Sequence, residues 1–144
     1  MTKEDKELLL EDICSRLPYG VKCQIQEDED TYVGTLHIIE VDNIHGHLLE
    51  FVETISGLNC QVYLSEIKPC LFPLSSMTEE QRKEYESLCI KETSECTDLY
   101  GIIFSKDYFY DTIESINYLY KNHIDIRGLI EKGLAVDCTN LNIY

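Results

Sequence analysis

The chain has 144 residues, close to the commonest size of one domain, and 44% of them are hydrophobic, so the sequence can bury a substantial core. Its 27 acidic and 12 basic residues give a formal net charge of −15, and the acidic residues are spread along the chain. A negative surface repels phosphate backbones. Direct nucleic-acid binding is therefore disfavoured, and a basic protein is the partner class that the charge favours.

Seven cysteines, an odd number, occur without a short repeated spacing. The opening segment MTKEDKELLL carries five charges, and the longest apolar runs are far shorter than the ~20 residues that cross a bilayer. We therefore expect neither a secretory signal nor a transmembrane segment. Reduced thiols fit this expectation, and the predicted localisation is cytoplasmic.

The first predicted element is a helix over residues 2–16, because apolar side chains from Leu10 to Leu17 recur at helical spacing. Thr2 and Asp5 form a capping pattern at its start. Period-two alternation then predicts four strands, at residues 21–25, 32–42, 47–54 and 60–64. The apolar phase of the second strand switches between Ile38 and Ile39, as at a β-bulge.

Four short strands in succession indicate an antiparallel meander. We expect it to close into a small SH3-like or Sm-like barrel, or a curled sheet, with the first helix at one end. An open sheet with one face covered by helices is the alternative. Pro69 and Pro73 bracket the segment that follows, which is predicted to be an extended connector because proline lacks a backbone donor.

The second half is predicted to be mainly helical. Thr78 and Gln81 form a capping box for a helix that ends near Lys91, and a polar loop and a short apolar strand over 99–104 follow. Asp107 is expected to cap a helix over 108–121, and Asp125 a short helix that ends at Gly133. The predicted class is α+β, with residues 1–76 and 77–144 packed as one compact unit.

Three segments of the chain carry a resemblance to a known family: MTKEDKELLLEDICSRLPYGVKC, LSEIKPCLFPLSSMTEEQRKEY and IDIRGLIEKGLA. In this order they resemble a family of small acidic proteins of gut Bacteroides and related bacteria that has no assigned activity. The resemblance covers somewhat under half of the chain. It implies a bacterial cytoplasmic protein from a variable or mobile genomic background, and it carries over no functional residue.

The densest cluster of potential metal ligands is formed by His37, Glu40, Asp42, His45 and His47. Imidazole and carboxylate groups together suit zinc or a similar divalent ion. We take His37, Asp42, His45 and His47 as the candidate ligands, with a solvated turn carrying incidental histidines as the alternative interpretation. No phosphate-binding glycine motif, nucleophile motif or paired carboxylate is present, so neither catalytic residues nor a cofactor are predicted.

Aromatic residues concentrate between positions 100 and 120. On the predicted helix, Phe109, Ile113 and Ile116 face one way and Tyr108 and Tyr118 another. If the first set fills the core, Tyr108 and Tyr118 form an exposed partner surface; burial of both sets is the alternative.

These observations favour a protein-interaction or regulatory module with an anionic surface rather than an enzyme. An acidic decoy that imitates nucleic acid is one form of this hypothesis. The alternatives are a metal-binding protein or metal-dependent enzyme that uses the cluster at 37–47, and an oligomeric structural subunit that associates through a sheet edge or the tyrosines.

Overall fold

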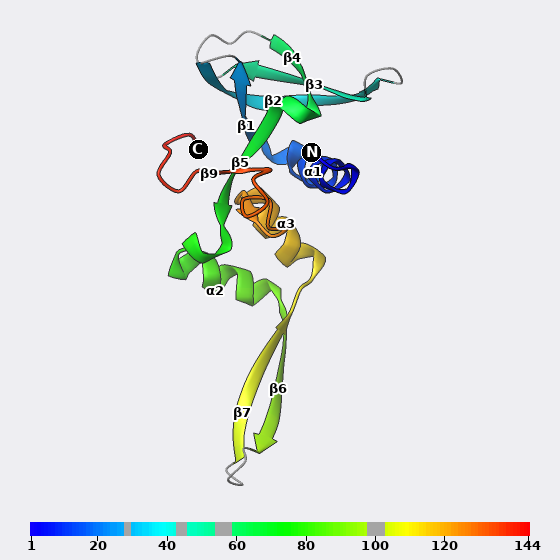
Figure 1. Cartoon of the computed structure of the whole chain (residues 1–144). Helices are drawn as coiled ribbons and strands as arrows, with labels where there is room; N and C mark the ends of the chain where they lie inside the picture. The colour runs from blue at the N-terminus through cyan, green and yellow to red at the C-terminus, as the bar shows by residue number, and fades with distance from the viewer. Residues whose placement is uncertain (28–29, 43–45, 54–58, 98–102) are drawn as a thin grey trace. The chain divides into compact units, whose positions relative to one another are not determined.

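The computed structural model describes residues 1–27, 30–42, 46–53, 59–97 and 103–144, and the side chains of residues 1–25, 31–39, 61–95 and 105–144 (Figure 1). The chain divides into two compact units. Unit 1 comprises Met1–Ser76 and Tyr120–Tyr144, and unit 2 comprises Met77–Leu119. Residues 120–144 therefore belong with the N-terminal half of the chain.

Within the described residues, unit 1 contains one long helix, several short helical turns and a mixed sheet (Figure 1). Its helices are α1 (Lys3–Arg16) and the turns η1 (Leu17–Tyr19), η2 (Leu64–Glu66) and η3 (Leu74–Ser76). Its strands are β1 (Lys22–Glu27), β2 (Asp30–Asp42), β3 (Gly46–Glu53), β4 (Asn59–Tyr63), β5 (Ile67–Pro73), β8 (Ile124–Asp125) and β9 (Val136–Asp137). The four strands predicted from alternation are confirmed as β1 to β4.

The sheet is open, so the prediction of an SH3-like or Sm-like barrel is wrong. Its strand order is β4-β3-β2-β1-β5-β8, with β9 also paired to β5. Strands β1 to β5 pair antiparallel, whereas β5 pairs parallel with β8 and β9. A closed barrel of the four predicted strands would require β1 to pair with β4. Instead, β1 pairs with β5, and β4 and β8 form the two opposite edges of the described sheet.

Strand β5 is the segment that the two prolines led us to predict as a connector, and that prediction is also wrong. Pro69 pairs with Cys23 of β1, while the pairing on the other side begins one residue later, at Cys70 and Val136. A missing backbone donor is tolerated where a strand has a partner on one side only. Pro69 thus lies where this strand exchanges β1 for β9, and Pro73 is the last residue of the strand, paired with Asp125 of β8.

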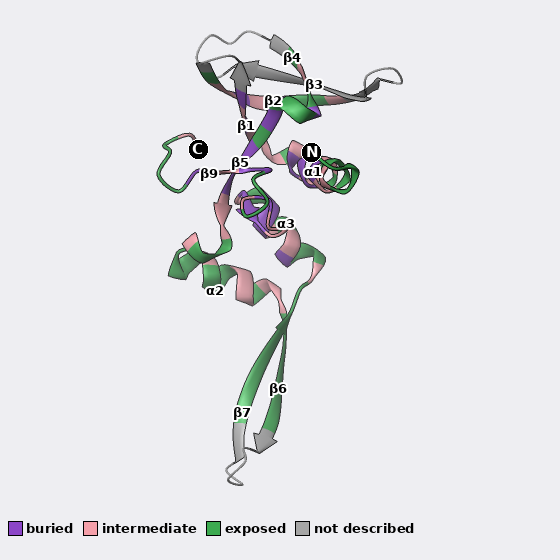
Figure 2. Cartoon of the chain, in the orientation of Figure 1, coloured by how far each residue is buried: buried purple, intermediate pink, exposed green. Residues whose placement is uncertain are grey.

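The core of unit 1 lies between α1 and the sheet. The predicted capping box of α1 is confirmed, since the Thr2 hydroxyl accepts from the Asp5 N–H and the Asp5 carboxylate accepts from the Thr2 N–H. One face of the helix is then fully buried (Figure 2). The cluster comprises Leu9, Ile13, Val21, Cys23, Ile25, Leu36, Leu64, Ile67, Leu71, Leu129, Leu134 and Ala135.

Unit 2 contains α2 (Glu79–Leu88), β6 (Ile90–Thr97), β7 (Ile103–Tyr110) and α3 (Ile113–Lys121), whose last two residues are counted in unit 1. The capping box of Thr78 and Gln81 is confirmed. A mainly helical second half is not what the chain forms, because β6 and β7 make a two-stranded antiparallel ribbon. No helix in the described part of the chain is long and apolar enough to cross a membrane.

Helix α3 begins later than predicted. Asp107 does not cap it but lies within β7, and the helix starts after Thr112. The Thr112 hydroxyl accepts from the Ser115 N–H at 3.1 Å, and the Ser115 hydroxyl accepts from the Thr112 N–H at 2.8 Å. This reciprocal pair satisfies backbone donors at the start of the helix, as a capping box does.

Candidate functional site

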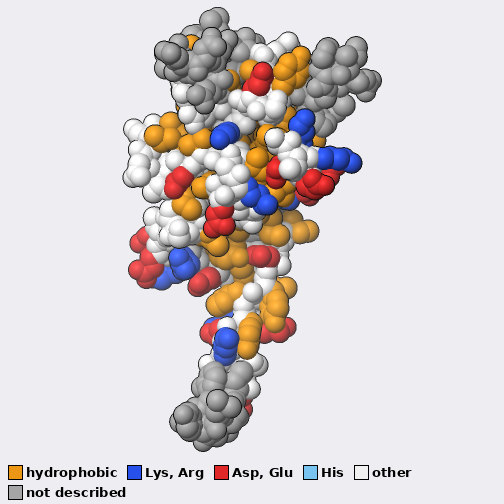
Figure 3. All heavy atoms as spheres, in the orientation of Figure 1, with side chains coloured by type: hydrophobic (Ala, Val, Ile, Leu, Met, Phe, Trp, Pro, Cys, Tyr) orange, Lys and Arg blue, Asp and Glu red, His pale blue; other side chains and the backbone are white. Residues whose placement is uncertain are grey.

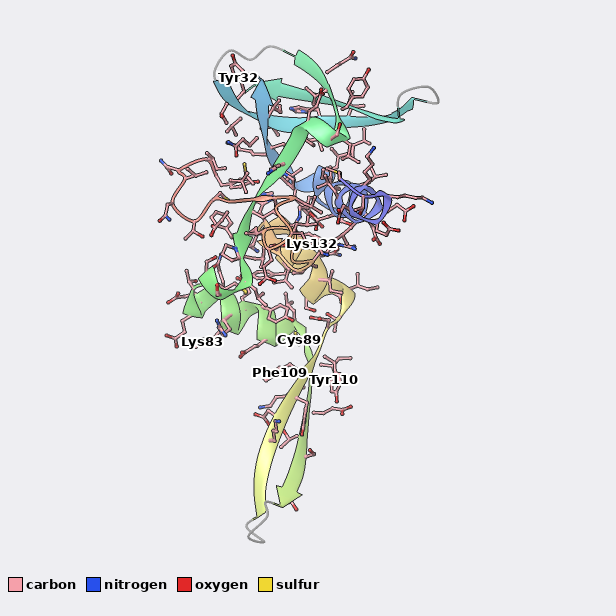
Figure 4. The ribbon with its side chains drawn as sticks, in the orientation of Figure 1. Tyr32, Lys83, Cys89, Phe109, Tyr110 and Lys132 are labelled. Atoms are coloured by element: carbon pink, nitrogen blue, oxygen red, sulfur yellow. The ribbon has the colours of Figure 1, made fainter. Side chains whose placement is uncertain are left out.

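The β6–β7 ribbon presents two different faces to solvent. All of its described side chains, at 90–95 and 105–110, are exposed (Figure 2). Because side chains alternate across a strand, the register assigns them to two sets. The aromatic face consists of Ile90, Glu92, Ser94, Lys106, Tyr108 and Tyr110, and the polar face of Lys91, Thr93, Glu95, Ser105, Asp107 and Phe109. Figure 4 shows Phe109 and Tyr110 on opposite sides of the ribbon.

On the polar face, the charges of Lys91 and Asp107 pair with each other across the two strands. Lys91 Nζ lies 2.8 Å from Asp107 Oδ2, and the Thr93 hydroxyl donates to Asp107 Oδ1 at 2.7 Å. Hydrogen bonds from Lys91 and Thr93 hold the pKa of Asp107 below its usual range. Lys91 Nζ also lies 5.9 Å from the centroid of the Phe109 ring. This network ties the two strands together, and Glu95 is the one charged side chain of the polar face without an ion pair among the described residues.

The aromatic face exposes more large apolar side chains than the polar face, where Phe109 is 43% exposed. Ile90 is 57% exposed, Tyr110 50% and Tyr108 37%, and Ile113, just beyond the strand, is 77% exposed. Figure 3 shows hydrophobic side chains gathered along the described part of the ribbon. A contiguous exposed apolar patch in a folded protein is a mark of an interaction site. We therefore take the aromatic face as the candidate functional site.

Helices α2 and α3 fix the ends of the ribbon. The Thr112 hydroxyl donates to the Leu88 carbonyl oxygen at 2.8 Å, and the Tyr85 hydroxyl donates to Asp111 Oδ1 at 2.5 Å. Burial and this carboxylate raise the pKa of Tyr85. The residues that flank the aromatic face thus make hydrogen bonds within unit 2. These hydrogen bonds hold the adjoining ends of β6 and β7 in place.

The two predicted partner-surface residues lie on different elements. Tyr108 is on β7, in the aromatic face, rather than on a helix as predicted. Tyr118 is half-buried on α3, and its hydroxyl donates to Glu84 Oε2 at 3.2 Å. Burial and that carboxylate raise the pKa of Tyr118. The structure therefore does not bring the two tyrosines together on one helical face.

The predicted metal ligands fall mostly outside the described side chains. His37 is exposed on β2, at the register shift between Leu36 and Ile38, which places the predicted bulge about one residue earlier. The backbone register sets Asp42 opposite Gly46 and Val41 opposite His47, but the side chains of Asp42 and His47, and the whole of His45, are outside the described residues. Among the described residues, no three or more potential metal ligands lie close together.

A buried ion pair joins α1 to β8 in unit 1. Arg16 and Asp12, both fully buried, are linked at 2.7 Å from Nε to Oδ2 and at 3.0 Å from Nη2 to Oδ1. Arg16 Nη2 also donates to the Ile124 carbonyl oxygen at 2.7 Å, and its guanidinium carbon lies 5.0 Å from the centroid of the Tyr120 ring. These contacts connect segments far apart in the sequence, so we assign the pair a structural role.

Asp125 caps a turn rather than the predicted short helix. Its carboxylate accepts from the Leu129 N–H at 3.0 Å and from the Ile130 N–H at 2.8 Å. The residues up to Gly133 form bends and turns. Asp125 was correctly predicted to satisfy these backbone donors, but the segment does not continue into a regular helix.

His123 and Tyr144 form a stacked pair in unit 1. Their ring centroids are 4.0 Å apart with an interplanar angle of 17°. The Tyr144 hydroxyl accepts from the Lys22 N–H at 3.0 Å and donates to the Cys70 carbonyl oxygen at 2.9 Å. His123 is buried with Nδ1 unbonded, and burial, with help from the Arg16 and Lys22 charges, lowers its pKa to about 4.

Three thiols near this pair, those of Cys23, Cys70 and Cys138, are buried. Burial raises the pKa of Cys70 to about 11 and that of Cys138 to about 12, and it raises the pKa of Cys23 as well. The thiolate is the reactive form, so a raised pKa suppresses nucleophilic chemistry. Cys14, by contrast, is exposed on α1.

Brief alkylation of the native protein at neutral pH, followed by peptide mass spectrometry, should therefore label Cys14 and leave Cys23, Cys70 and Cys138 unmodified. Denaturant should make all four equally reactive, which controls for peptide recovery. Native labelling of Cys70 at the rate of Cys14 would contradict the burial described here.

No family model, curated protein or solved structure matches this chain.

Proposed function

We propose that this protein is a protein-interaction module that docks a partner on the aromatic face of the β6–β7 ribbon. The observation that carries the proposal is the contrast between the two faces. The polar face pairs Lys91 and Thr93 with Asp107 and exposes one large apolar side chain, Phe109, whereas the aromatic face exposes three: Ile90, Tyr108 and Tyr110. A partner that buries this face gains the free energy of removing apolar surface from water.

The charge of unit 2 favours a basic partner over a second copy of the chain. Residues 77–119 contain ten acidic and four basic side chains. Lys83 and Lys91 are paired with carboxylates, and Lys106 Nζ lies 5.1 Å from the centroid of the Tyr108 ring. Two chains that each carry −15 repel one another, whereas a basic surface is attracted and steered to the ribbon.

Site-specific photo-crosslinking in the producing cell tests this proposal. A benzophenone amino acid is placed at Tyr110, on the aromatic face, and at Thr93, on the polar face, as a matched control on the same ribbon. We expect one dominant adduct with a basic protein from position 110 and little from position 93. When a cell lysate is irradiated at low and at high salt, the yield of the adduct should fall at high salt, which screens electrostatic attraction. The adduct should disappear when Ile90→Ser and Tyr108→Ser are introduced together.

These two substitutions also provide a folding control. Both side chains are exposed and each belongs to one cross-strand pair, so the free energy of unfolding should change by no more than about 1 kcal/mol per site. Equal adducts from both faces, or adducts that survive the double substitution, would overturn the proposal. An adduct with a second copy of the chain would replace it with self-association.

A further inference from the structure

The β6–β7 ribbon has open edges as well as an open face. Strand β6 pairs with β7 over all eight of its residues, and among the described residues neither strand pairs with any other (Figure 1). Each strand of an antiparallel pair directs alternate backbone N–H and C=O groups away from its partner. Such an edge is a template for a further strand, whose main-chain hydrogen bonds supply affinity.

The charges distinguish the edge of β6 from that of β7. Strand β6 carries Glu92 on the aromatic face and Glu95 on the polar face, and neither takes part in an ion pair within the described residues. The described charged groups of β7 are engaged, since Asp107 binds Lys91 and Lys106 lies over the Tyr108 ring. The uncompensated negative charge of the described ribbon therefore lies on β6.

We propose, building on the proposed function, that the partner inserts an extended basic segment as a third strand along the outer edge of β6. Directly opposite residues in paired strands are close neighbours, so a Lys or Arg would lie beside Glu92 on one face and another beside Glu95 on the other. An apolar side chain would lie beside Ile90 and extend the cover of the aromatic face.

The spacing of these three positions defines the sequence that fits. Ile90 and Glu92 are two residues apart, and Glu92 and Glu95 are three apart. An antiparallel added strand therefore needs two basic residues three positions apart, followed two positions later by an apolar residue. The intervening residues should be strand formers without proline, because proline would remove a backbone donor.

A synthetic peptide with the sequence Ser-Lys-Thr-Thr-Lys-Thr-Val-Ser, blocked at both ends, tests this with the full-length protein. Titration followed by nuclear magnetic resonance should show binding, with slowed hydrogen exchange at alternate amides of β6 and no comparable change in β7. A peptide with Glu in place of both Lys should not bind. No binding of the basic peptide, or protection centred on β7 or α2, would overturn the inference.

Two further arms separate strand addition from packing on the aromatic face. Methylation of alternate peptide nitrogens should abolish binding for one set of positions and spare it for the other, because only one set faces β6. Glu92→Gln and Glu95→Gln should each weaken binding by about two- to fivefold, whereas Glu80→Gln, an exposed acidic residue on α2, should leave it unchanged.

The outcomes also distinguish this inference from the proposed function. Strand addition would be overturned if the peptide bound equally well with either set of its nitrogens methylated. If position 110 still gave face-specific crosslinking, the docking face would stand. Protection of β6 that grows with protein concentration in the absence of peptide would assign the edge to a second copy and overturn the basic partner.

Discussion

Arg16→Met is expected to lower the free energy of unfolding by about 3 kcal/mol or more, because it leaves the Asp12 carboxylate charged and buried without its main partner. The Ile124 carbonyl oxygen loses a donor in the same step. Arg127 Nε, 3.7 Å from Asp12, offers partial compensation, which places the effect toward the lower end of the range for broken buried pairs. Urea unfolding followed by circular dichroism measures the change.

The double variant Asp12→Leu with Arg16→Met is the matched control. Replacing a whole buried ion pair by apolar side chains is commonly close to neutral, because the cost of removing both charges from water disappears with them. Arg16 Nη1, buried without an acceptor, adds to that cost in the native protein. We therefore expect the double variant to be more stable than Arg16→Met alone. The reverse order would show that the pair itself, rather than the orphaned charge, sets the stability.

The second large effect is a loss of stability on acidification that depends on His123. Its pKa is lowered from 6.5 to about 4 in the folded protein. As the pH falls below about 6.5, the His123 imidazole takes up a proton in the unfolded chain but stays neutral in the folded chain. The stabilising contribution is thus complete above that pH, falls progressively below it, and is lost by about pH 4; between pH 7 and pH 5 it drops by about 2 kcal/mol.

His123→Asn removes the titrating group and suits the backbone, because the residue has φ of 56°, a conformation that asparagine tolerates. The measured quantity is the change in unfolding free energy between the two pH values, in the wild type and in the variant. The variant should show a change smaller by about 2 kcal/mol, whatever its absolute stability. Equal pH dependence in both proteins would rule out His123 as the acid-sensitive group.

The parts of the fold that follow from the sequence are those set by local patterns. Helix α1, strands β1 to β4 and the start of α2 were predicted because one face of each is apolar or because a capping box marks its start. Whether the sheet closes depends on which strand pairs with β1. Pairing between strands that are distant in the sequence cannot be recognised from a local sequence pattern. Strand β5, which pairs with β1, was not predicted as a strand because it contains two prolines.

Strand β6 was missed for a different reason. The sequence from Ile90 to Thr97 is almost entirely polar, because both faces of the ribbon are exposed and no alternation is required. The end of β7 was assigned to a helix because Phe109, Ile113 and Ile116 have helical spacing. The signal that could have corrected this is the run from Tyr108 to Tyr110, since three successive aromatic residues are typical of a strand.

The candidate site was predictable only in part. Tyr108 was identified as a partner residue, and it does lie in the exposed aromatic face, but on a strand opposite Glu92 rather than on a helix beside Tyr118. Ile90, which shares that face, was not identified because its membership depends on the pairing of β6 with β7. A face shared by two strands becomes visible only when their register is known.

The insertion of unit 2 within the chain of unit 1 has a consequence for folding during synthesis. Strand β5 emerges from the ribosome before unit 2, whereas β8 and β9, which pair with it, emerge after unit 2. At ~5–20 residues per second, β5 waits on the order of several seconds for these partners. Arg16 waits about twice as long for the Ile124 carbonyl oxygen that it binds, because 108 residues separate the two in the chain. Unit 2 can therefore finish folding while unit 1 still lacks β8 and β9. The unit whose synthesis begins first is then the last to fold completely.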